Sequence, residues 1–262
     1  MNRIIVPIVV FAVAGLASLL VLDFYREQPQ DRTIRLAVDV PYEPFEYYDS
    51  SGNLTGFEIE LGDAVCAEMQ LSCQWVVQAW DGIIDGLLDR RYEVIFSSMS
   101  ITPDRAERVL FSEPYYTTPS GWFVRTGSDL NPDDPASLLG MRVGVQRGTI
   151  QDNYITNHVD GLDVRRYSTA DDFVLDLEGG RLDAIFVDFP VGEQTILSRP
   201  GFESVGEPVT EPRSVFGDGV GAAFHPDDRA LADVFNEGLE RVKQNGTYEQ
   251  IMNSYFNYDI MI

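Results

Sequence analysis

The chain has 262 residues, of which 44% are hydrophobic and 23% are charged, as in a folded protein with one large core or two modest ones. Its formal net charge of −23 repels the phosphates of DNA and RNA, so a nucleic-acid-binding function is disfavoured. The acidity suits a cationic ligand or a saline habitat, and composition leaves both explanations open.

The N-terminal segment is predicted to direct export. Residues 4–22 follow Arg3 and carry no charge over a length that can cross a bilayer. We expect residues 1–22 to be a cleaved signal peptide or an uncleaved membrane anchor, and residues 23–32 to form a polar linker. The protein is then periplasmic, either free or tethered to the inner membrane.

The two cysteines, Cys66 and Cys73, have a spacing that suits neither a CxxC redox pair nor a zinc site. In an oxidising compartment, we expect a disulfide between a helix end and the next strand rather than two free thiols.

From residue 33 onward, β-branched runs alternate with helical patterns, which predicts an α/β fold. The predicted strands are residues 33–40, 73–78, 93–100, 141–146, 163–168 and 182–188. Apolar residues at helical spacing predict helices over residues 57–70, 80–91, 169–180 and 227–256, the last with a break at Gly246.

This alternation begins near Ile34 and again near Met141, which indicates two lobes rather than one long sheet. Extended segments near residues 116–122 and 213–222 are the expected crossings between the lobes. We therefore predict one lobe from residues 33–118 and 219–262, and a second from residues 119–218.

Polar side chains follow the apolar runs of four predicted strands, two in each lobe. Because open α/β sheets bind ligands at the carboxyl ends of their strands, this pattern predicts one shared site. The strand-end residues are Asp39, Ser97, Ser98, Ser100, Gln146 and Asp188.

Arg105 lies in the first turn of a helix that Thr102 is expected to cap. The free N–H groups of such a turn attract an anion, and an arginine there can bind a carboxylate with two hydrogen bonds. The same stretch is equally consistent with a capped helix and a solvated arginine. "RGTIQD" repeats the arrangement in the second half, where Thr149 caps a helix from about Ile150.

Asp188 follows an apolar strand and has no local basic partner. Its carboxylate needs a counter-charge, either an ammonium group of a ligand or a basic residue from elsewhere in the fold. An anion clamp together with a cation acceptor favours a zwitterion, and therefore an α-amino acid. Asp39, Tyr42 and Trp80 suit a cationic side chain, although either aromatic residue could instead belong to the core.

Enzyme motifs are lacking in the sequence. His158 and His225 lie away from the strand ends, and no nucleophile elbow, phosphate loop or metal-ligand cluster is present. We expect no enzyme activity, no cofactor and no metal.

Six motifs taken together resemble the periplasmic solute-binding proteins for polar amino acids, especially the lysine/arginine/ornithine, histidine and opine binders. The resemblance spans residues 33–260, and its motifs are "DVPYEPFEY", "GFEIEL", "SSMSITPDR", "GVQRGTIQ", "GRLDAIFVD" and "NGTYEQI". It implies a type II periplasmic-binding-protein fold, in which two parallel or mixed sheets flanked by helices are joined by two hinge strands and close over the ligand.

The resemblance also implies roles for individual residues. Arg105 would bind the ligand carboxylate with backbone N–H groups near Ser100 and Ile150, and Asp188 with Ser98 and Ser100 would bind the ammonium group. Asp39 and Ser97 would meet the distal cationic group, between the rings of Tyr42 and Trp80. The expected ligand-binding set is Asp39, Tyr42, Trp80, Ser97, Ser98, Ser100, Arg105, Gln146, Thr149, Ile150 and Asp188.

Two positions depart from the family pattern and bear on ligand identity. Ile150 replaces a common threonine, and Trp80 replaces a common phenylalanine. Cys66 and Cys73 match a disulfide of the basic amino-acid binders. The resemblance implies a monomer that delivers its ligand to the membrane subunits of an ABC transporter. The alternatives are a cyclohexadienyl (arogenate/prephenate) dehydratase-like enzyme and a membrane-tethered amino-acid sensor.

Overall fold

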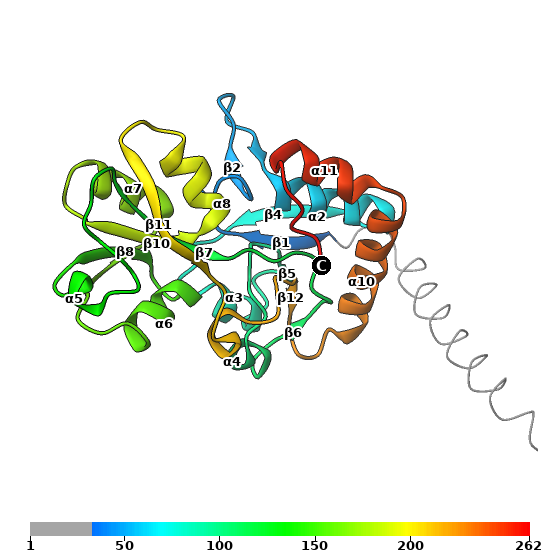
Figure 1. Ribbon diagram of the computed structural model, residues 1–262. Coiled ribbons are helices and arrows are strands. Elements are labelled where there is room, and N and C mark those ends of the chain that lie inside the picture. Colours follow the sequence, from blue (N-terminus) through cyan, green and yellow to red (C-terminus); the bar gives the residue numbers. More distant parts are fainter. Residues whose placement is uncertain (1–32) are drawn as a thin grey trace, which may run out of the picture.

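The computed structural model describes residues 33–262, which form two five-stranded sheets flanked by helices (Figure 1). The predicted export segment and linker, residues 1–32, lie outside the described residues. Within residues 33–262, no helix combines the length and apolar character that a membrane crossing requires.

The first sheet has the strand order β4-β1-β5-β12-β6 and contains both parallel and antiparallel pairs. β1 pairs in parallel with β4 and β5, whereas β12 runs antiparallel to β5 and β6. Its strands are β1 (Ile34–Val38), β4 (Cys73–Val77), β5 (Val94–Ile95), β6 (Leu110–Phe111) and β12 (Ala223–Phe224).

The helices of this half come from both ends of the described chain. α10 and α11 pack against α2 although the whole second sheet lies between them in the chain, as the neighbouring cyan, orange and red ribbons in Figure 1 show. The elements are α2 (Phe57–Glu68), α3 (Ile83–Leu88), α4 (Pro103–Ala106), α10 (Arg229–Gln244) and α11 (Thr247–Tyr255), with the small hairpin of β2 (Tyr47–Tyr48) and β3 (Leu54–Thr55).

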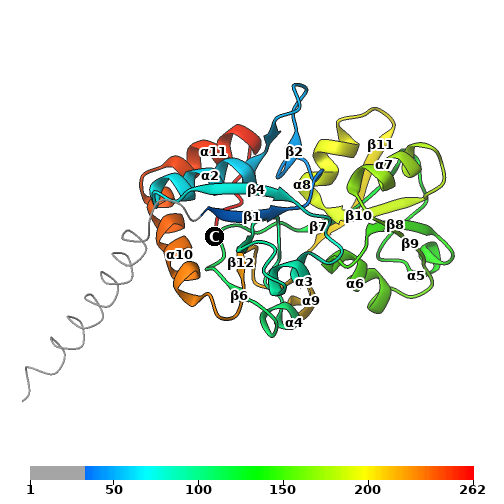
Figure 2. The ribbon, with the colours of Figure 1, turned by 180° about the vertical axis from the view of Figure 1, so that it is seen from behind.

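The second sheet has the order β11-β7-β10-β8-β9, seen from behind in Figure 2. β8 pairs in parallel with β9 and β10, and β7 runs antiparallel to β10 and β11. Its strands are β7 (Ser120–Arg125), β8 (Arg142–Gln146), β9 (Asp163–Tyr167), β10 (Ala184–Asp188) and β11 (Phe202–Val209). Its helices are α5 (Pro135–Leu138), α6 (Ile150–Asn157), α7 (Ala170–Glu178), α8 (Phe189–Gly192), the π-helical turn η1 (Glu193–Leu197) and α9 (Arg213–Phe216).

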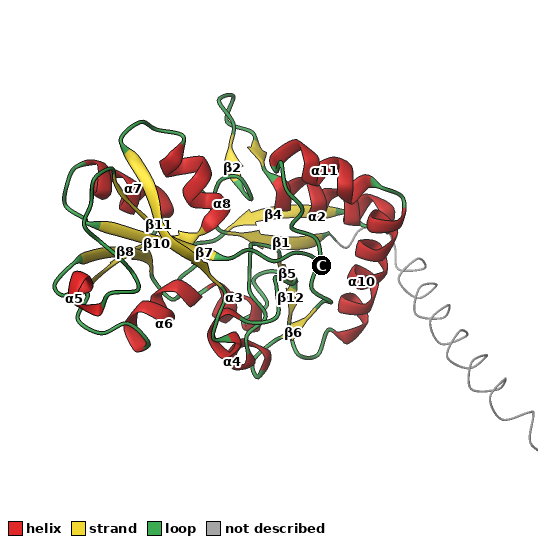
Figure 3. Ribbon diagram, in the orientation of Figure 1, coloured by secondary structure: helices red, strands yellow, loops and turns green. Residues whose placement is uncertain are grey.

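Local sequence signals account for several helix boundaries. The side chains of Thr102, Thr149 and Thr169 each accept a hydrogen bond from a backbone N–H in the first turn of α4, α6 and α7. Gly246 has a left-handed backbone with φ of 82°, which ends α10 and allows α11 to begin in a new direction. The helices of both halves are red in Figure 3, and the strands are yellow.

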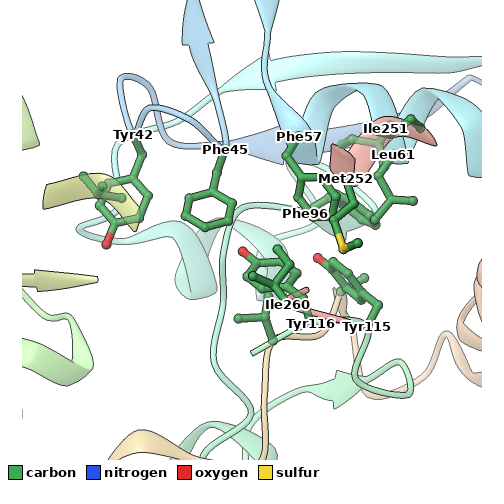
Figure 4. Close-up of a cluster of buried hydrophobic side chains, with 14 of the residues drawn as sticks. Tyr42, Phe45, Phe57, Leu61, Phe96, Tyr115, Tyr116, Ile251, Met252 and Ile260 are labelled. Carbon is green, nitrogen blue, oxygen red and sulfur yellow. The ribbon is translucent and has the colours of Figure 1, made fainter. Parts of the chain in front are cut away.

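A cluster of aromatic residues forms much of the core beneath the first sheet. The ring of Phe45 stacks on that of Tyr116 with 5.2 Å between centroids, and the ring of Phe96 stacks on that of Tyr115 at 5.1 Å. Figure 4 shows these side chains converging with Phe57 from α2. Such pairs stabilise the fold beyond the burial of their area alone.

The α/β prediction is confirmed, and each predicted strand contains an observed one. The strand predicted over residues 93–100 is reduced to Val94–Ile95, because the chain turns away at Ser98, where φ is 48°. β11 has no counterpart among the predicted strands, since its largely exposed residues form no apolar run.

The second predicted crossing, residues 213–222, is not extended throughout. α9 begins directly after Pro212, and Val215 and Phe216 are buried in the second core, so the prediction was wrong for this part. Tyr116 and Val220 pair with each other, one from each crossing segment. The predicted lobe limits fall between β6 and β7 and between β11 and β12, and they stay a prediction.

Candidate functional site

A cavity lies where loops of the two sheets meet, and all eleven predicted ligand-binding residues line it. Two further residues, Glu46 and Gln151, line it without having been predicted. The complete lining is Asp39, Tyr42, Glu46, Trp80, Ser97, Ser98, Ser100, Arg105, Gln146, Thr149, Ile150, Gln151 and Asp188.

Sheet topology explains why residues so far apart in sequence share one cavity. Asp39 follows β1, Ser97 follows the neighbouring strand β5, and Gln146 and Asp188 are the last residues of β8 and β10. In parallel strands the carboxyl ends lie at the same edge of the sheet, so these side chains converge. The structure therefore places these strand-end residues around one cavity, and their roles in ligand binding stay predictions.

Arg105 is the basic residue among those lining the cavity. Its Nη1 donates a hydrogen bond of 2.9 Å to the carbonyl of Ser100, and its guanidinium carbon lies 5.2 Å from the ring centroid of Trp80. Burial lowers the pKa of Arg105 to about 10, with Asp188 opposing this shift. The guanidinium therefore stays charged at neutral pH, held by a carbonyl and an aromatic face.

Asp188 accepts hydrogen bonds from hydroxyls at two different places in the chain. The hydroxyl of Tyr42 donates to Oδ2 at 2.5 Å, and Oγ1 of Thr118 donates to Oδ1 at 3.2 Å. Burial raises the pKa of Asp188 to about 6, although these hydrogen bonds and Arg105 oppose the shift. The basic side chain from elsewhere, which the sequence left open, corresponds to Arg105 acting at a distance rather than through a direct ion pair.

Asp39 is buried with 5% of its surface exposed, and it is tied to the other half of the protein. Nε2 of Gln146 donates to Oδ2 of Asp39 at 2.5 Å, and the backbone N–H of Asp39 donates to Oγ of Ser97 at 2.9 Å. Burial is the main cause that raises the pKa of Asp39 to about 6. An acid of this kind favours a cationic partner in the cavity.

Glu46 is the charged site residue that the sequence analysis missed. It is 1% exposed, and its carboxylate accepts hydrogen bonds from Oγ of Ser97 at 2.8 Å and Oγ of Ser98 at 3.3 Å. The backbones of Tyr42 and Glu46 pair, so the chain reverses and directs this acid inward. Glu46 follows no predicted strand and begins no predicted helix, so no local signal marked it. Its inward direction depends on the chain reversal alone.

Contacts across the cavity mouth join the two halves. Nε1 of Trp80 donates to the carbonyl of Gly148 at 3.1 Å, and Arg147 lies 3.6 Å from Asp81 in an ion pair. These two contacts and the Tyr42–Asp188 and Gln146–Asp39 hydrogen bonds hold the loops of both sheets close together.

The remaining residues singled out in the sequence lie away from the cavity. Cys66 and Cys73 form the expected disulfide, between the last part of α2 and the start of β4. His158 stacks on Tyr154 at the end of α6, and His225 contacts Arg90 on the surface.

The cavity can therefore hold a small dipolar molecule with additional positive charge. The lining contains one guanidinium and three carboxyls, those of Asp39, Glu46 and Asp188. A ligand carboxylate matches the guanidinium, and two cationic groups on the ligand would offset the acids that water no longer solvates.

Comparison with known proteins agrees with this chemistry. Residues 34–258 match the bacterial extracellular solute-binding proteins, family 3. The L-arginine-binding protein of Pseudomonas aeruginosa is 37% identical over 235 residues, covering 88% of this chain and 90% of that protein. The lysine/arginine/ornithine-binding periplasmic protein of Escherichia coli is 35% identical over 233 residues, with 87% and 89% covered. A structure of a Salmonella typhimurium periplasmic binding protein with high arginine specificity has a TM-score of 0.81 at 28% identity, covering 86% of this chain and all of that one.

Proposed function

Because this chain belongs to family 3 of the bacterial extracellular solute-binding proteins, we propose that it binds a basic L-α-amino acid in the periplasm, with arginine as the preferred ligand. The observation that carries this proposal is the charge of the cavity. Its lining contains three buried or partly buried acids and one guanidinium, which is the complement of an amino acid with a second positive charge.

The proposed roles follow from what each group can donate or accept. Arg105 binds the ligand carboxylate with two hydrogen bonds, helped by backbone N–H groups at Ser100 and Ile150. Asp188 accepts hydrogen bonds from the α-ammonium group, with the hydroxyls of Ser98 and Ser100 as further acceptors. These groups recognise what all amino acids share.

Asp39, Ser97 and Glu46 are proposed to bind the distal cation of the ligand side chain. Oγ of Ser97 accepts from the backbone N–H of Asp39 and donates to the carboxylate of Glu46, and the charge of Asp39 raises the pKa of Glu46, so the two acids lie near each other. Trp80 and Tyr42 would flank the aliphatic part of the ligand. A planar guanidinium, which has five donors, suits two neighbouring carboxylates better than a single ammonium group does.

The bound ligand is proposed to pass to the membrane subunits of an ABC transporter, with a monomeric protein opening and closing about the two crossings. The named relatives are binding proteins, which favours this function over the cyclohexadienyl dehydratase-like alternative. Tethering of the protein by residues 4–22 is a further proposal.

Calorimetry with the twenty common amino acids, ornithine, octopine and citrulline tests the function. We expect binding at about −8 kcal/mol or tighter for arginine, which corresponds to roughly micromolar affinity. Citrulline, which has nearly the same shape as arginine but no side-chain charge, should bind much more weakly. A preference for glutamate or leucine would contradict the proposal.

A further inference from the structure

A further buried acid, Glu58, lies behind the cavity wall and does not line the cavity. Glu58, in the first turn of α2, has no exposed surface. Its carboxylate accepts hydrogen bonds from the backbone N–H of Ser98 at 3.0 Å and from the hydroxyls of Tyr115 and Tyr116, each at 2.9 Å. Figure 4 shows both tyrosines in the aromatic cluster beside Phe57, the neighbour of Glu58 in the chain.

Ser98 connects this acid to the cavity acid Glu46. Its N–H donates to Glu58, while its hydroxyl donates to Oε2 of Glu46 at 3.3 Å and lies 2.9 Å from the hydroxyl of Tyr116. The backbone of Ser98 is left-handed, with φ of 48°, a conformation that a residue other than glycine keeps only when its surroundings hold it. The bond from its N–H to Glu58 provides such support.

The two acids also interact through their charges. Among residues 33–262, neither carboxyl forms a hydrogen bond or an ion pair with a basic side chain, and both are buried. Burial raises the pKa of Glu46, and the charge of Glu58 raises it further, as does Asp39 to a smaller degree. The titratable groups that face Glu58 are Glu46 and the phenols of Tyr115, Tyr116 and Tyr248. Two buried carboxyls so placed compete for a proton.

We propose that Glu58 is a positioning residue that acts through Ser98 on Glu46 and controls whether Glu46 presents an ionised carboxylate to a cationic ligand side chain. This inference rests on the proposed function. Glu58, which lies outside the cavity, would then influence how strongly the protein prefers ligands with a charged side chain over neutral ones. It would also influence the pH at which this preference is lost.

The sign of the effect follows from repulsion between like charges. A ligand cation needs Glu46 ionised, so affinity for arginine falls when acidification protonates Glu46. The negative charge of Glu58 makes Glu46 take up its proton at a higher pH. Glu58→Gln keeps the shape of the side chain and an acceptor oxygen for the N–H of Ser98, but it removes this charge and turns the second oxygen into a donor. Glu46 should then stay ionised to a lower pH.

The experiment measures the ratio of arginine to citrulline affinity by calorimetry from pH 5 to pH 8.5. Using the ratio cancels the titration of Asp188, which would face the ammonium group common to both ligands. Asp39 also faces the distal cation and titrates in this range, so the effect of Glu58 is the difference between the variant and the native protein, both of which contain Asp39. In Glu58→Gln, we expect the midpoint at which this ratio falls to move down by about one pH unit. An unchanged midpoint with a uniform loss of affinity at every pH indicates only a structural role and overturns the inference.

A matched pair of conservative variants tests the route through Ser98, and it applies even if Glu58→Gln does not fold. Tyr115 and Tyr116 are both fully buried, and both donate to Glu58, but only Tyr116 also contacts the Ser98 hydroxyl. Tyr116→Phe should change the arginine-to-citrulline ratio several-fold more than Tyr115→Phe. Equal changes of this ratio in the two variants would contradict an influence transmitted through Ser98. Failure of the unmodified protein to bind arginine would instead contradict the proposed function.

Discussion

The hydroxyl of Tyr42 donates a hydrogen bond of 2.5 Å to Asp188, although 146 positions separate the two residues in the chain. Tyr42 belongs to the loop after β1 of the first sheet, and Asp188 ends β10 of the second sheet. The bond therefore joins the two halves at the proposed binding site of the ligand ammonium group. The orientation of the Asp188 carboxylate therefore depends on how closely the loops of the two sheets lie together.

Tyr42→Phe should weaken the binding of every amino acid by about tenfold, because a hydrogen bond to a charged group contributes roughly 1.5–3 kcal/mol. The loss should be equal for arginine and citrulline, since Asp188 would face the part that they share. Calorimetry with both ligands measures it. A loss confined to arginine would place Tyr42 at the distal cation of the side chain instead.

Arg105→Lys should reduce arginine affinity more than a hundredfold, because an ammonium group cannot form the paired hydrogen bonds of a guanidinium with a carboxylate. Arg108→Ala is the matched control, since Arg108 lies three residues away and forms an ion pair with Asp85 outside the cavity lining. Equilibrium binding of labelled arginine compares the two variants. Similar losses in both would contradict a direct contact between Arg105 and the ligand.

Asp39→Asn should weaken arginine binding more than tenfold while changing citrulline binding little, because the substitution removes a buried negative charge and keeps the shape. The amide can still accept the hydrogen bond from Gln146, which in the native protein is 2.5 Å long. Competition assays with both ligands give the two affinities. Equal losses would mean that Asp39 supports the fold rather than ligand choice.

The free energy of unfolding of the ligand-free protein should depend on pH because Asp39 and Asp188 have raised pKa values. Burial raises the pKa of each to about 6, above the value of about 3.9 in an unfolded chain. The native state then binds more protons than the unfolded state, so this stabilising contribution is complete below about pH 4 and is lost as the pH rises through 6.

Denaturation curves of the native protein and an Asp39→Asn/Asp188→Asn double variant at several pH values test this expectation. Between about pH 4 and pH 6.5, the native protein should lose free energy of unfolding relative to the variant. Parallel curves would show that neither acid has a raised pKa in the folded protein.

Replacing both Cys66 and Cys73 with alanine should lower the free energy of unfolding by about 2 kcal/mol, because the disulfide closes a short loop in the unfolded chain. Urea denaturation measures the loss. Arginine affinity should be unchanged, since the bond joins the end of α2 to the start of β4 and neither cysteine lines the cavity. A large loss of affinity would show that the bond also shapes the site.

Much of the fold and the site could be predicted from the sequence because the signals involved are local. Apolar runs and helical spacing marked β1, β8, β10 and the helices between the strands, and Thr102 and Thr149 marked two helix starts. The polar residues at strand ends then followed from one rule of sheet topology, by which Asp39 and Ser97 come to one edge of the first sheet and Gln146 and Asp188 to one edge of the second.

The tertiary structure alone decided which of these groups contact one another and which hidden acids join them. Glu46 turns inward because the chain reverses at Tyr42, and Glu58 reaches the site through Ser98 from an unrelated helix. Spacing along the chain carries no record of such contacts. They arise when segments that are distant in the chain pack together, and burial then forces every charged group to find a partner or a proton.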